Sequence, residues 1–275
     1  MSAQRTRNRC IRLLILAVIC GFTLAFFKLM EIALRPTAIY TGFLLFALIF
    51  FLALYDLRKR IRFLPIGSAQ AWLQFHVYTG IYSGLVFAIH VGWHIPNGLF
   101  EGVLALIYLF TFCSGLVGLF LSRSFAKRLA TSGGEILFTR IPAQVAVLRL
   151  EVESLVMNYL AQSDSTALPE FYATRLRPYF ATSKNVFHHL VQSSRPRTAL
   201  LQEIRGFERY LDEKERAIIK QISDNVVLKD KLDYQYALQL ALKVWLFVHV
   251  PLTFALMVFG TIHLLLVVAF TGRMG

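Results

Sequence analysis

The sequence predicts an all-α polytopic membrane protein: a helical bundle of about five transmembrane helices with a helical cytoplasmic insert. Three observations predict this class. Hydrophobic residues make up 56% of the 275-residue chain, well above the usage of globular proteins. They gather in stretches long enough to cross a bilayer. The Lys and Arg residues, which give a formal net charge of +13, gather at the ends of these stretches, as the positive-inside rule expects.

The first half of the chain holds four apolar stretches. They predict transmembrane helices over residues 11–30, 37–57, 71–93 and 99–121, and each is about the length that spans the hydrocarbon. The first stretch follows a basic run and resembles a signal peptide. However, Phe26, Phe27 and Lys28 stand where a cleavage site needs small residues. We therefore expect an uncleaved first helix.

Residues 123–240 predict a soluble, mostly helical insert, because charge is dense and prolines punctuate the stretch. A helical apolar stripe is clear in residues 143–161, and residues 198–211 form a second amphipathic stretch. Residues 135–140 are interpreted as a short strand. Residues 211–239 lack Pro and Gly, so we expect them to continue as one helix into a fifth transmembrane helix within 241–275.

The basic clusters at 5–12, 58–62 and 123–128 predict the orientation. By the positive-inside rule they place the N-terminus and the 123–240 insert in the cytoplasm, for a multi-pass protein of the inner (plasma) membrane. The third and fifth transmembrane helices then run in the same direction.

Cysteine and charge exclude several other classes. Cys10, Cys20 and Cys113 form no C-x-x-C pair, which argues against a disulfide framework, a zinc site, an iron–sulfur cluster and covalently attached haem. No basic face with interleaved aromatic residues is present, so we expect no nucleic-acid partner. The lipid bilayer is the expected surrounding.

Two histidine pairs with the same spacing lie in the predicted third and fifth transmembrane helices. His76 and His90 are fourteen residues apart, and so are His249 and His263. Fourteen residues rise roughly 21 Å in nearly four helical turns, so each pair lies on one helix face. If the helices are parallel, His76 pairs with His249 near the cytoplasmic face and His90 pairs with His263 near the outer face.

Ionisable side chains inside a membrane are costly and usually functional. Two imidazoles at each of two levels are the ligands that two non-covalent b haems need, with the four histidines as iron ligands. Because both axial positions are filled, such haems favour electron transfer over oxygen chemistry. The second ring nitrogen of each histidine needs a hydrogen-bond acceptor, and the carbonyls one turn back are the expected ones, at Trp72, Val86, Trp245 and Phe259.

Other residues are weaker candidates for the same site. Gly80, Gly84 and Gly115 could allow close approach of a flat ring, although small residues also serve ordinary helix packing. His94, one turn beyond His90, could contact a haem propionate or a quinone, or could be an interfacial histidine with no special role. His188 and His189 lie in the insert, away in sequence from any Cys or carboxylate cluster, and we expect both at the solvated surface.

The histidine pattern resembles that of the N-terminal half of cytochrome b of quinol–cytochrome c reductases. Its placement on the third and fifth helices is also similar to the ferric reductase and NADPH oxidase transmembrane domain. The resemblance covers roughly the second to fifth helices and rests on His76, His90, His249 and His263. It implies electron transfer across a membrane through two bis-histidyl haems. The long insert, the absence of a flavin and nicotinamide domain and the lack of a Pro-Glu-Trp-Tyr motif are departures.

We therefore expect a di-haem b-type cytochrome, an electron-transfer subunit of an oxidoreductase complex. It would carry electrons between a quinone or membrane donor and a separate soluble redox partner, cytoplasmic or periplasmic. The insert would be a docking platform for such a partner or a structural spacer. The alternative is a haem-free transporter or sensor that uses the histidines as a proton or metal path. Relays usually include intramembrane acids, whereas Glu31, Asp56 and Glu101 lie at or near helix ends.

Overall fold

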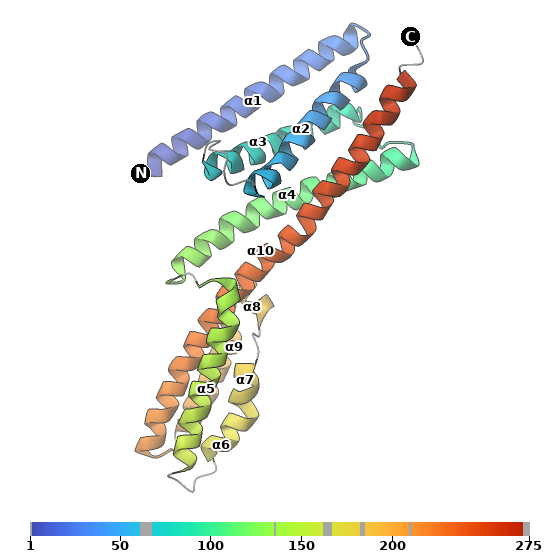
Figure 1. Ribbon diagram of the computed structural model, residues 1–275. Coiled ribbons are helices and arrows are strands. Elements are labelled where there is room, and N and C mark those ends of the chain that lie inside the picture. Colours follow the sequence, from blue (N-terminus) through green and yellow to red (C-terminus); the bar gives the residue numbers. More distant parts are fainter. Residues whose placement is uncertain are drawn as a thin grey trace. The chain divides into compact units, whose positions relative to one another are not determined.

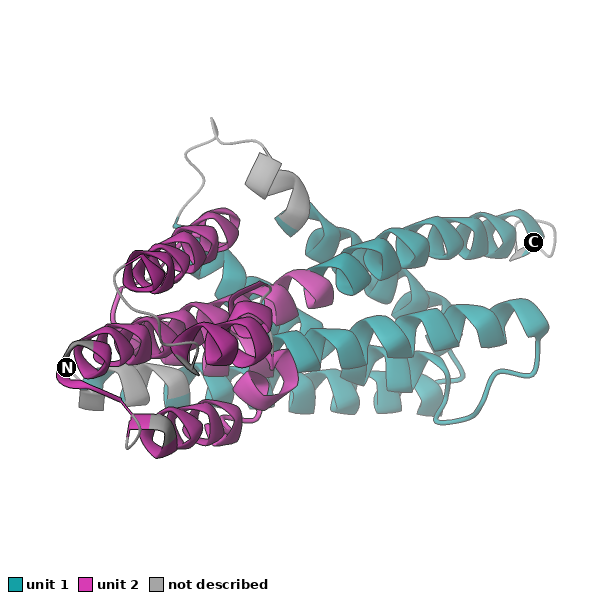
Figure 2. Ribbon diagram, turned by 90° about the horizontal axis from the view of Figure 1, so that it is seen from below, with its two compact units in different colours: residues 1–119, 246–275 teal, residues 120–245 magenta. Residues whose placement is uncertain are grey.

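The computed structural model describes residues 2–60, 68–134, 136–161, 167–181, 185–208 and 211–271. Throughout these ranges the regular structure is helical and no strand occurs (Figure 1). The predicted all-α class is confirmed. The chain forms two compact units, residues 1–119 with 246–275 and residues 120–245 (Figure 2).

The first unit is built from five long helices. They are α1 (Ser2–Ile32), α2 (Thr37–Arg60), α3 (Ala69–His90), the first part of α4 (Leu99–Thr131) and the last part of α10 (Glu213–Thr271). Helix α3 packs against α2 along its length and also contacts α1. The core of this unit includes Leu45, Val86, Tyr108 and Leu256, one from each of α2, α3, α4 and α10.

Four described helices, α1, α2, α4 and α10, are long and apolar enough to cross a membrane. By length and composition they are the helices of a membrane protein. The predicted count of five is not reached, because α3 is not among them. The 22 residues of α3 include several polar side chains that lower its hydropathy, namely Gln70, Gln74, His76, Thr79, Ser83 and His90.

Local chemistry sets the ends of α3. The Ser68 hydroxyl caps its start by accepting a hydrogen bond from the Ala71 N–H at 3.2 Å. The helix ends at His90, three residues before the predicted end. Gly92 and Trp93 there adopt positive φ values of 63° and 60°, and the Trp93 N–H donates to the Ala88 carbonyl at 3.1 Å. This left-handed turn closes the helix, so His90 lies in its last turn.

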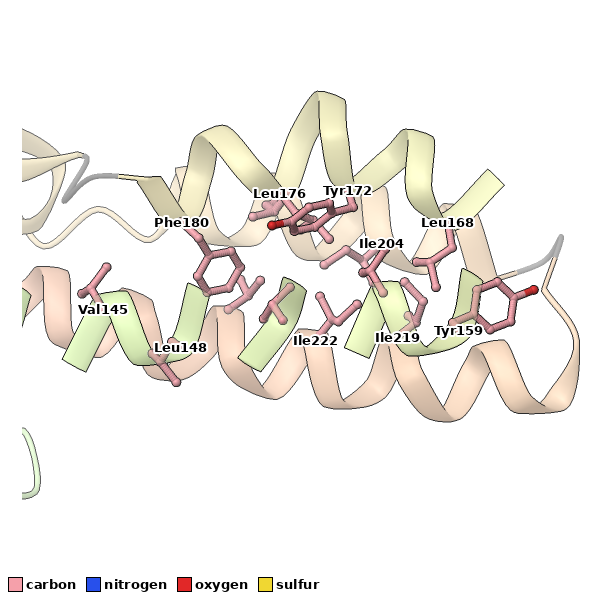
Figure 3. Close-up of a cluster of buried hydrophobic side chains, with 14 of the residues drawn as sticks. Val145, Leu148, Tyr159, Leu168, Tyr172, Leu176, Phe180, Ile204, Ile219 and Ile222 are labelled. Atoms are coloured by element: carbon pink, nitrogen blue, oxygen red, sulfur yellow. The ribbon is translucent and has the colours of Figure 1, made fainter. Parts of the chain in front are cut away.

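The second unit is a separate helical bundle. Its elements are α5 (Ile141–Leu160), α6 (Ala167–Phe171), the π-helical η2 (Tyr172–Leu176), α7 (Arg177–Ala181), α8 (Val186–Leu190), α9 (Arg195–Phe207) and the first part of α10. Figure 3 shows its core, to which α5 contributes Val145 and Leu148, α7 Phe180, α9 Ile204 and α10 Ile222. The apolar stripe predicted for residues 143–161 is the buried face of α5.

Two expectations for this unit are wrong. Residues 138–140 form the short 3-10 helix η1 (Phe138–Arg140) and not a strand, whereas Glu135 lies outside the described residues. His189 is buried, with only 6% of its surface exposed. Its ring packs against Tyr234 of α10 and lies 3.9 Å from Asp230 of the same helix, and both residues are far from His189 in the sequence. His188 is exposed, as expected.

Part of the basic cluster at 58–62 also lies outside the described residues.

Candidate functional site

The structure brings the two outer histidines of the predicted pairs together. His90 is at the end of α3 and His263 is in α10. Their ring centroids are 6.4 Å apart and their planes are inclined at 80°. Phe100 of α4 also lies beside His263, with ring centroids 6.2 Å apart. Sequence positions 173 residues apart thus form one site.

The separation of these rings matches two ligands of one metal ion. An imidazole nitrogen binds a first-row metal at about 2 Å, and each nitrogen lies roughly 1 Å from the centre of its own ring. Two imidazoles on opposite sides of one ion therefore have centroids roughly 6 Å apart. The 6.4 Å between the ring centroids of His90 and His263 is close to that separation.

The hydrogen bonds of His90 determine which ring nitrogen is available. Its Nδ1 lies 3.1 Å from the Ala38 carbonyl oxygen and 3.2 Å from Thr41 Oγ1. A carbonyl can only accept, so Nδ1 carries the proton in the neutral ring and Nε2 keeps its lone pair. A hydrogen bond at the ring nitrogen that does not bind metal fixes the orientation of a histidine ligand. The acceptor is on α2, so the expectation that the Val86 carbonyl would serve is wrong.

The inner pair, His76 and His249, lines a second site. Both histidines border one cavity of about 100 Å³, together with Gly80 and Gly115. His249 Nδ1 lies 2.8 Å from the Ser114 hydroxyl oxygen of α4. The His76 ring stands beside the Tyr55 ring of α2, with centroids 4.9 Å apart. The two pairs predicted from spacing are therefore the two pairs that the fold places around cavities.

The outer cavity is larger and mostly apolar. It has a volume of about 370 Å³ and is bordered by His90 and His263, with Gly42 and Gly260 among its lining. Glu101 and Pro96 also border it. A mostly apolar cavity with a few polar groups is typical of a cofactor site.

The glycines fall into two groups. A Cβ on Gly80 would meet nothing within 4 Å, and one on Gly115 would lie 3.6 Å from His249 Cε1, so both face the inner cavity. Gly84 instead admits the Phe112 ring, which would be 2.8 Å from an added Cβ. Gly84 is thus a packing contact between α3 and α4, and the structure does not place it in the lining of either cavity.

Sequence reasoning missed Gly42, Gly260, Thr41 and Ser114. Gly42 lies directly beside His90, since a Cβ there would be 2.9 Å from His90 Cε1. A signal was available: Gly42 and Gly260 are the single glycines in the predicted second helix and in residues 241–270, where bulky apolar residues dominate. His94 is exposed and borders neither histidine cavity.

The described residues contain no group of three or more His, Cys, Asp or Glu side chains that could hold a bare metal ion. A haem iron needs only two ligands from a protein, because the porphyrin supplies the other four. No protein-family model, curated protein or solved structure matches this chain.

Proposed function

We propose that this chain is a membrane electron-transfer subunit that holds two b-type haems between α3 and α10. The observation that supports this best is the outer histidine pair, whose ring centroids lie 6.4 Å apart beside one cavity. His90 and His263 would hold one haem, and His76 and His249 the other. A haem held by two imidazoles would gain and lose one electron and would leave no open position for substrate.

The residues present suit this group. Each pair offers two imidazoles, and Nδ1 of His90 is already committed to Ala38, which would leave Nε2 for iron. Gly80, Gly115 and Gly260 line the cavities beside the histidines, and Gly42 admits the His90 ring. The inner cavity is smaller than the outer one, so we expect inner side chains to move apart when a haem binds.

The chain's own residues orient the ligands and exclude water. Thr41 Oγ1 donates to its own helix at the Thr37 carbonyl, 2.8 Å away, so its oxygen accepts from Nδ1 of His90. Ser114 Oγ lies within hydrogen-bond distance of His249 Nδ1, at 2.8 Å. Apolar side chains such as Leu45, Ile49 and Leu256 line the cavities. A low-polarity surrounding of this kind helps set a haem's reduction potential.

This proposal counts α3 as a fifth transmembrane helix. Its polar face is turned partly toward cavities and neighbouring helices: Ser83 is bonded to Tyr108 at 3.0 Å, and His90 is bonded to α2. Polar residues in a membrane helix are tolerated where they face the bundle interior. We further propose a cytoplasmic N-terminus and insert in the inner membrane, from the positive charge at 5–12, 58–62 and 123–128.

Donor and acceptor would be separate molecules, a quinone on the membrane side and a soluble redox subunit on the other. The unit formed by residues 120–245 would serve as the docking platform for the soluble subunit. The dimensions support passage across the bilayer, because the two histidine levels are roughly 21 Å apart along each helix.

The haem content of the purified full chain tests the function. A pyridine haemochrome assay should give two haem b per chain, extractable with acid acetone because no C-x-x-C-H motif is present to attach them. The reduced spectrum should be that of low-spin haem. Well-folded protein without haem, prepared from cells supplied with a haem precursor, would contradict the proposal and favour the transporter or sensor alternative.

A further inference from the structure

A third cavity lies between α1 and α3, away from both histidine sites. Its volume is about 490 Å³, and α1 contributes Ile15, Leu16 and Ile19 to an apolar wall. The α3 wall is polar by comparison, with Gln74, Tyr78 and Thr79. The neighbouring positions His76, Val77 and Gly80 of α3 border the inner histidine cavity. One helix, about 10 Å across with its side chains, therefore separates the two cavities.

Two interhelical hydrogen bonds bracket this cavity. Arg12 of α1 donates to the Gln74 side-chain oxygen of α3. Farther along both helices, Thr23 and Tyr82 share a hydrogen bond of 2.9 Å. Because both residue numbers rise together, α1 and α3 run in parallel. The two contacts hold the helices together at two levels and leave the space between them open.

Two hydroxyls, those of Tyr78 and Thr79, line this space. Neither Tyr78 nor Thr79 has a hydrogen bond to any of the described residues. Thr79 is unusual, because five other threonines of these apolar helices donate to the carbonyl four residues earlier; they are Thr23, Thr41, Thr111, Thr253 and Thr261. The hydrocarbon chains of lipids offer such donors no acceptor, and an unsatisfied polar group in hydrocarbon costs several kcal/mol. A ligand that accepts hydrogen bonds would satisfy both hydroxyls.

We propose that this cavity binds the head group of a membrane quinone. A quinone enters from the bilayer, is flat and apolar, and carries two carbonyl oxygens that accept from hydroxyls. Tyr78 and Thr79 supply those donors, Arg12 and Gln74 stand near one end, and the Phe75 ring lines the cavity beside them. The choice of a quinone among lipid-soluble carbonyl compounds rests on the proposed electron-transfer function. An anionic phospholipid would use Arg12 but would leave the two deeper neutral hydroxyls unsatisfied.

Photolabelling of the full chain tests this assignment. The purified protein is placed in phosphatidylcholine nanodiscs, labelled with a short-chain azidoquinone, and competed with decylubiquinone. Label is expected on residues 12–19 and 71–82. The Tyr78→Phe and Thr79→Val variants should each weaken decylubiquinone competition about five- to tenfold, the effect of one neutral hydrogen bond. The matched controls Tyr40→Phe and Thr261→Val remove a hydroxyl outside the cavity and should leave competition unchanged.

Label elsewhere in the chain, or unchanged competition in both cavity variants, would overturn the quinone site. So would loss of the label when anionic phosphatidylglycerol replaces part of the phosphatidylcholine, because a lipid would then be the occupant. Haem spectra of the same samples separate the two proposals. Haem with no quinone binding removes only the quinone site, whereas quinone binding without haem removes only the di-haem function.

Discussion

At the residue scale, a single backbone carbonyl decides the chemistry available at His90. The Ala38 carbonyl fixes the proton on Nδ1, and the lone pair therefore stays on Nε2. Ala38 and Thr41 belong to α2, which contributes no predicted ligand. The helix that orients the ligand is thus a different one from the two that supply the histidines.

Gly42 gives a prediction at the same scale. An added Cβ would lie 2.9 Å from His90 Cε1, so Gly42→Ala should displace the imidazole at a cost of about 1–3 kcal/mol, as in other overpacked sites. We expect the absorption band of the outer haem to weaken or to show a change of spin state, while the band of the inner haem remains. Low-temperature absorption spectra of the reduced protein measure both.

Gly102→Ala is the matched control, because a Cβ there would meet nothing within 4 Å. It should leave both spectral components as in the natural protein. If Gly42→Ala were equally silent, the close approach of α2 to His90 would not matter for the site.

At the element scale, the parallel course of α3 and α10 determines which histidines share a site. His76 and His249 border the inner cavity, and His90 and His263 border the outer one. An antiparallel course would have exchanged the partners, pairing His76 with His263.

Single histidine variants test this pairing. His76→Ala and His249→Ala should lose the same spectral component, and His90→Ala and His263→Ala should lose the other. Within a pair the double variant should be little worse than either single one, because both ligands act on one site. Redox titrations with spectra measure this. A match between His76→Ala and His263→Ala would rule out the parallel assignment.

We expect the short helix α8 to respond to pH through His189. Burial lowers the pKa of His189 below its ordinary value, which outweighs the opposite effect of Asp230, 3.9 Å away. Asp230 is also paired with Arg197 at 3.2 Å. Arg128 holds the His189 carbonyl at 2.8 Å, and Lys229 is a further buried charge near this cluster.

The sign of the effect follows from the lowered pKa. The unfolded chain binds a proton at His189 near pH 6.5, whereas the folded chain resists it, so stability falls as the pH drops below about 6.5. Burial raises the pKa of Asp230. Its effect on stability is the opposite one: as the pH falls toward the ordinary carboxyl pKa near 4, proton binding at Asp230 favours the folded chain.

Hydrogen exchange of α8 amides in the full chain, measured from pH 7 to 5.5, should show falling protection. His189→Gln should flatten this dependence. His188→Gln changes the exposed neighbour and should not. Identical pH profiles for the two variants would show that His189 burial has no part in the response.

At the scale of the whole molecule, the proposed orientation puts residue 97 outside the cell and residue 194 in the cytoplasm. In a background without Cys10, Cys20 and Cys113, an impermeant maleimide applied to intact cells should label Asn97→Cys and leave Ser194→Cys unlabelled. Both positions should react once the membrane is opened, which controls for reactivity. The reverse pattern would invert the protein and exchange the inner and outer histidine sites, while the pairing would persist.

The sequence by itself determined the helical class, the apolar helices and the matched histidine spacing. These properties are local: hydropathy accumulates along one stretch, and a fixed helical rise converts spacing into depth. The end of α3 was misplaced by three residues, because the left-handed turn at Gly92 and Trp93 competes with an apolar run that continues past it.

Only the tertiary structure decided which helix supports which ligand. The partners of His90 on α2, the space at Gly42, the burial of His189 and the unpartnered Tyr78 and Thr79 all depend on contacts between helices. Those contacts depend on how each helix is rotated about its own axis. A helix that is apolar on all sides fits many rotations equally well by hydropathy, so its sequence does not reveal the face that meets its neighbour. Packing of the side chains selects one rotation, and that selection creates the sites.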